Sequence, residues 1–88
     1  MVAYVLIPTL QFNEHREALL ERARKDSSYG CFQVLGDEAV IAFACDASAG
    51  FFWGYCLKIG IQGHDLEIDG VRRHPEVGIP PQFTNDNP

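Results

Sequence analysis

The sequence predicts an α+β domain: an antiparallel sheet of about five strands, in the order βαββββ, with one helix packed on one face. Three observations predict it. The chain opens with a short apolar run, it has one segment with signals at both ends of a helix, and a later stretch alternates large and small residues with a period of two. With 88 residues, 47% of them hydrophobic, the chain has the size of one domain and enough apolar material for a core.

The first two elements are a strand over residues 2–7 and a helix from about residue 13 to residue 25. The strand is rich in β-branched and aromatic residues. Asn13 is a candidate N-cap, and the carboxylates of Glu14 and Glu17 suit the positive end of the helix dipole. Basic residues gather toward Lys25, at the negative end.

A tight hairpin is expected next, from a strand over residues 31–35 and another over residues 39–45. Gly36-Asp37-Glu38 supplies the turn, because glycine adopts positive φ without strain. Closing the turn there pairs Val34 with Ala39 and Phe32 with Ile41.

The stretch from Phe51 to Ile61 is interpreted as a long strand. Its odd positions are large and mostly apolar, and its even positions are mostly small or polar. This strand would place Phe43 opposite Trp53 and Ile41 opposite Tyr55. The alternative is a helix over residues 47–60, which gives the order βαββαβ of a ferredoxin-like sandwich. That helix would contain Gly50 and Gly54, each costing about 1 kcal/mol relative to alanine.

A turn at residues 62–65 leads into the last expected strand, residues 66–72. This hairpin would pair Lys58 with Asp69, an opposite-charge pair that supports the register. The domain is therefore expected to span residues 1–72. Residues 73–88 contain several prolines and are expected to form an extended or disordered C-terminal tail.

Charge and cysteine content limit the classes of function. The net charge of −5 disfavours direct binding to nucleic acid and favours a partner with a basic surface. The three cysteines lack metal or redox spacing, and the first residues lack a basic leader, so we expect reduced thiols and a cytoplasmic location. No apolar run approaches the length of a membrane span.

No metal, cofactor or catalytic site is predicted. The histidines and cysteines are not spaced as zinc ligands. Each cysteine falls in an expected strand, and none precedes an expected helix N-terminus that would lower its pKa. We therefore expect a protein without enzymatic activity.

A single narrow helix cannot cover a sheet of five strands, so we expect a second copy of the chain or a target protein to cover the rest. Phe52 is the first candidate for the contact, because it falls on the lighter face of the expected sheet. The other candidates are Gly54, with its bare backbone, and the acidic residues Asp46, Glu67 and Asp69.

These expectations favour a small acidic module that binds a partner protein and occludes or modulates it. Stand-alone inhibitors have this profile, including toxin-immunity proteins and phage proteins that act against host defence. The alternative is a small enzyme or small-molecule-binding domain of the dimeric α+β-barrel type. The first half of the chain, a helix followed by Gly30–Leu35 and a hairpin, loosely resembles that class.

Overall fold

In the computed structural model, which describes residues 2–74, the chain forms an α+β fold with a five-stranded antiparallel sheet. Both of these predictions are confirmed. The elements, in order, are β1 (Ala3–Pro8), α1 (Thr9–Glu14), α2 (Arg16–Arg24), β2 (Tyr29–Leu35), β3 (Glu38–Phe43), α3 (Asp46–Lys58), β4 (Asp65–Ile68) and β5 (Val71–Arg73). Of the predicted tail at residues 73–88, only Arg73 and His74 are described, and Arg73 is the last residue of β5; the rest lies outside the described residues.

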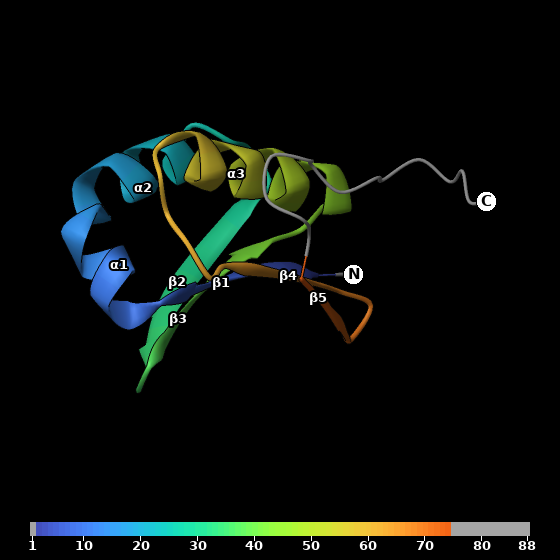
Figure 1. Ribbon diagram of the computed structural model, residues 1–88. Helices are drawn as coiled ribbons and strands as arrows, with labels where there is room; N and C mark the ends of the chain where they lie inside the picture. Colours follow the sequence, from blue (N-terminus) through green and yellow to red (C-terminus); the bar gives the residue numbers. More distant parts are fainter. Residues whose placement is uncertain (1, 75–88) are drawn as a thin grey trace.

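The sheet has the strand order β2-β3-β1-β4-β5. The first four strands and their helices make the βαββαβ arrangement of a ferredoxin-like sandwich, and β5 extends the sheet beyond β4. The three helices lie on one side of the sheet (Figure 1). The predicted order βαββββ with a single helix is therefore wrong, and the alternative order describes the first four strands.

The strand expected at residues 51–61 is instead the C-terminal part of α3 and the loop after it. A helix is favoured over a strand for this segment because it places Ala49, Phe52, Trp53 and Cys56 together on the sheet, where all are buried. Fully burying one such aromatic side chain stabilises the fold by roughly 1.5–3 kcal/mol, which exceeds the cost of a helical glycine. A Cβ on Gly54 would meet no atom within 4 Å, so that position lies in open space.

β1 occupies the place that the long strand was expected to take. Phe43 pairs with Ala3, and Ile41 pairs with Val5, so neither faces residues 53–55 as predicted. The predicted pairing of Lys58 with Asp69 is also wrong, because Lys58 ends α3. The β2–β3 hairpin is as predicted: Val34 pairs with Ala39, Phe32 with Ile41, and Gly36 has a φ of 68°.

The predicted helix at residues 13–25 is two helices that meet at His15. The first begins at Thr9, so Asn13 lies in its last turn and caps nothing. Thr9 fixes the start of α1 to the hairpin turn: its hydroxyl donates to the Gly36 carbonyl at 2.6 Å, and its N–H donates to the Asp37 carbonyl at 2.8 Å.

The strand predicted at residues 66–72 is likewise two strands, β4 and β5. Asp69 and Gly70 turn the chain between them with φ values of 55° and 78°. Positive φ at both central residues is the requirement of a tight type I′ hairpin, and an Asp-Gly pair meets it.

The core lies between the sheet and the helices. Alternate residues of β1, β3 and β4 point into it, and α3 closes it from above in Figure 1. The largest fully buried side chains are those of Trp53, Phe12, Phe43 and Phe52.

The neighbouring residues Phe51 and Phe52 test the helical assignment directly. Phe52→Ala should lower the free energy of unfolding by about 3–5 kcal/mol, because it removes a ring that is 2% exposed. Phe51→Ala should change it by about 0.5 kcal/mol or less, since that ring is 67% exposed. Urea unfolding of both variants measures the difference, and a larger loss for Phe51→Ala would restore the strand interpretation.

Candidate functional site

The five residues predicted to contact a partner do not form one surface. Phe52 lies in the core, 2% exposed, so its predicted place on an open face is wrong. Gly54 lies on α3, and Asp46 is the first residue of that helix. Glu67 lies in β4 on the face away from the helices, and Asp69 is exposed in the β4–β5 turn.

The face of the sheet away from the helices is the first candidate site. Its centre is apolar: Leu6 pairs with Val40, and Tyr4 pairs with Ala42, all four pointing away from the core. No described helix lies over this face (Figure 1). We call it the open sheet face.

Arg72 closes one side of the open sheet face. Its Nε donates to Asp65 Oδ2 at 2.7 Å, and its two terminal nitrogens donate to the carboxylate of Glu38. Because β1 separates β4 from β3, this side chain of β5 crosses β1 and bonds to two other strands, β4 and β3. The hydrogen-bonded carboxylate of Glu38, followed by that of Asp65, raises the pKa of Arg72.

Asp65 is 2% exposed although it faces away from the core, and the charges around it explain how it is tolerated. Arg72 donates to Oδ2, and His74 Nδ1 lies 2.5 Å from Oδ1, although Oδ1 accepts no hydrogen bond of good geometry within residues 2–74. A buried carboxylate is stable only when it is paired and hydrogen-bonded, so removing Arg72 would leave a costly charge.

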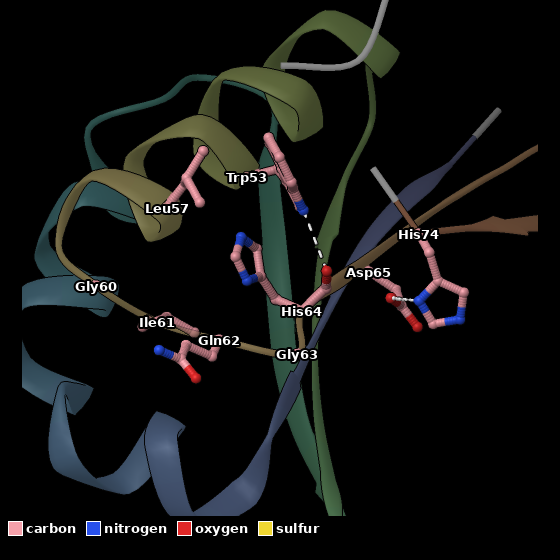
Figure 2. Close-up of a pocket in the computed structure, with 9 residues that line it drawn as sticks. All are labelled: Trp53, Leu57, Gly60, Ile61, Gln62, Gly63, His64, Asp65 and His74. Carbon is pink, nitrogen blue, oxygen red and sulfur yellow. Dashed lines mark hydrogen bonds and ion pairs between the residues drawn. The ribbon is translucent and has the colours of Figure 1, made fainter. Parts of the chain in front are cut away.

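The second candidate site is a pocket of about 450 Å³ beside the C-terminal half of α3. Trp53 and Leu57 from the helix, the loop over residues 60–63 and His64 line it (Figure 2). Asp65 and His74 lie at its other end. We call it the His64 pocket.

The His64 side chain is the unusual feature of this pocket. It is 7% exposed, yet neither ring nitrogen has a hydrogen-bond partner among residues 2–74. Its ring packs on Trp53 with centroids 4.9 Å apart, and the Trp53 indole N–H donates to the His64 carbonyl at 3.2 Å. Each unsatisfied buried polar atom costs about 1–3 kcal/mol, so this imidazole needs a partner. Burial lowers the pKa of His64 and favours the neutral ring.

Cys45 corrects the prediction that no cysteine precedes a helix N-terminus. It is the N-cap of α3, with an exposed side chain. The nearby backbone N–H groups of Ser48 and Ala47, followed by the Ser48 hydroxyl, lower the pKa of the Cys45 thiol, although its side chain makes no capping hydrogen bond within the described residues. Cys56, by contrast, is buried in the core, and burial raises the pKa of its thiol.

Neither metal binding nor membrane spanning finds support within the described range. Residues 2–74 contain no group of three His, Cys, Asp or Glu side chains placed to hold a metal ion. None of the helices in this range is long and apolar enough to cross a bilayer.

The Cys45 thiol should be alkylated fastest of the three cysteines at pH 7, because the thiolate is the attacking species. Iodoacetamide labelling followed by peptide mass spectrometry measures each site separately. Cys31 serves as the control, since it is also exposed, and Cys56 should react only after unfolding. Equal rates at Cys45 and Cys31 would contradict the prediction.

Stability should fall as the pH is lowered below about 6.5, the ordinary pKa of histidine, because the unfolded state then binds a proton that folded His64 resists. Above that pH the contribution of neutral His64 is complete, and it is lost as the pH approaches the lowered pKa of the folded state. Urea unfolding at pH 7.5 and pH 5.5 measures the slope. His64→Phe should flatten it and His15→Phe should not; an unchanged slope in His64→Phe would contradict the assignment.

Comparison with protein-family models, curated protein sequences and solved structures finds no match for this chain.

Proposed function

We propose that this chain is a protein-binding module that uses the open sheet face to contact a partner with an apolar centre and a basic rim. The observation that carries the proposal is an apolar row on a face that no described helix covers, in which Leu6 is buried with 6% of its surface exposed and Tyr4, Val40 and Ala42 are half-buried. An apolar patch framed by polar residues is typical of an interaction surface.

The charge around the row supports a basic partner. Glu38 and Glu67 are partly exposed on this face beside Arg72, whereas Asp65 lies there with only 2% of its surface exposed. Carboxylates therefore outnumber the guanidinium there, in agreement with the net charge of −5. A basic rim would complement this frame and speed association.

A second copy of the chain is the other occupant that we predicted. Two open sheet faces brought together would place carboxylates against a surface that is itself acidic, which makes a different, basic protein the favoured occupant. An inhibitory, immunity or anti-defence role, without catalysis, remains the class of activity that we propose for such a module.

Val40→Lys tests the proposal, because it puts a positive charge at the centre of the face. The matched control is Phe51→Lys, which changes an exposed residue of α3 on the other side of the sheet. Affinity purification with wild-type and Phe51→Lys baits should recover a basic protein. Val40→Lys should lower the affinity for that protein by about tenfold or more, equivalent to about 1.4 kcal/mol. Thermal unfolding of the three baits checks that each is folded.

Light scattering of the wild-type chain at micromolar concentration separates the two occupants. A dimer that Val40→Lys dissociates and Phe51→Lys does not would assign the face to a second copy. A monomer with no basic partner, or a partner that Val40→Lys retains, would overturn the proposal.

A further inference from the structure

We propose that the His64 pocket binds a small uncharged molecule that has an apolar body and an amide or hydroxyl group, with the His64 imidazole as its polar contact. Its volume of about 450 Å³ lies within the range of sites for small molecules. The part of the pocket beside His64 sits against α3, on the helix side of the molecule, and it shares Asp65 with the open sheet face at its other end.

The imidazole supplies the polar half of the site. Figure 2 shows its ring pointing from the start of β4 toward Leu57, in the space bounded by α3 and the loop over residues 60–63. Both ring nitrogens lack a partner among the described residues, and the side chain is more than nine-tenths buried. A neutral imidazole has one donor and one acceptor, and an amide or hydroxyl offers the complement to either nitrogen.

The site is held in shape before a ligand arrives. Trp53 contacts His64 twice, through ring packing and through the hydrogen bond to its carbonyl. The side-chain amide of Gln11 donates to the Gln62 carbonyl at 2.7 Å and ties the loop to α1. Gly63 has a φ of 71°, a conformation that other residues rarely adopt. A preformed site loses less freedom on binding and therefore binds more tightly.

The surrounding residues favour an uncharged ligand. Trp53, Leu57 and Ile61 make an apolar wall. Among the described lining residues, the ionisable groups besides His64 are Asp65 and His74. Arg72 donates to Asp65 Oδ2, and His74 Nδ1 lies 2.5 Å from Oδ1, although Oδ1 accepts no hydrogen bond of good geometry from the described part of the chain. Because this carboxylate already has two basic neighbours, a charged ligand would lose its water without gaining an unshared opposite charge.

Benzamide, benzoate and benzamidine test both halves of the proposal, because they share one shape and differ in charge. Trp53 is the only tryptophan, so its indole N–H gives a single signal that reports on the pocket in ¹H–¹⁵N NMR titrations. Benzamide should shift this signal saturably with a Kd of about 1 mM. Benzoate and benzamidine should bind at least about tenfold more weakly than benzamide. His64→Phe should weaken benzamide binding about tenfold, and His15→Phe, a change outside the pocket lining, should leave it unchanged.

A measurement on the wild-type protein keeps the test independent of how the variants fold. Nuclear Overhauser contacts from the benzamide ring to the methyl groups of Leu57 and Ile61 should appear on saturation. Absence of a saturable shift up to about 10 mM benzamide would overturn the proposal. Equal binding by folded His64→Phe, or tighter binding of either charged probe, would also overturn it.

Discussion

The packing of α3 on β1, β3 and β4 is the constraint on which the rest of the structure depends. Phe52 packs on Phe43 of β3 with ring centroids 5.2 Å apart, and Trp53 donates its indole N–H to the carbonyl of His64, the residue immediately before β4. One pair of adjacent aromatic residues therefore ties the helix to strands on both sides of β1. The same contacts direct the exposed positions of α3 outward and form one wall of the His64 pocket. Because all three helices are drawn to one side, the opposite face of the sheet is left open.

Local patterns in the sequence predicted the β2–β3 hairpin but not the β4–β5 hairpin, although its Asp69-Gly70 turn is an equally local signal. The β2–β3 hairpin has the predicted pairing because its turn glycine and its alternation act over a few residues. The aromatic run was harder to interpret, since its residues alternate in size with period two and also bury a face with period near 3.6. Intrinsic preference favoured a strand, but burial against a sheet assembled from distant segments decided for a helix. The entry of β1 into the sheet beside β3 and β4 has no local signal at all.

The candidate sites were less predictable than the fold for the same reason. The helical alternative began at residue 47, one residue later than α3, so it would have placed Cys45 near a helix N-terminus without identifying it as the N-cap. His64 carries no such signal, because its burial results from contacts with Trp53 and the pocket wall. The bridge from Arg72 to Asp65 and Glu38 joins residues from three strands and requires the register of each. Phe52 was assigned to the wrong environment because a strand buries every second residue on one face, whereas the helix buries the neighbours Phe52 and Trp53 together.

The central place of β1 in the sheet has a consequence for how the chain folds. This first strand pairs with β3 on one side and with β4 on the other, and its partners lie in the middle and in the last third of the described residues. During synthesis, the β2–β3 hairpin can form early. Both edges of β1 can be paired only after β4 has been synthesised. The slow step is then the closure of the long loop between β1 and β4, which local contacts do little to accelerate. A nascent chain that ends before β4 would keep an apolar central strand with one unpaired edge. Chaperones bind such exposed edges, and the edges also promote aggregation.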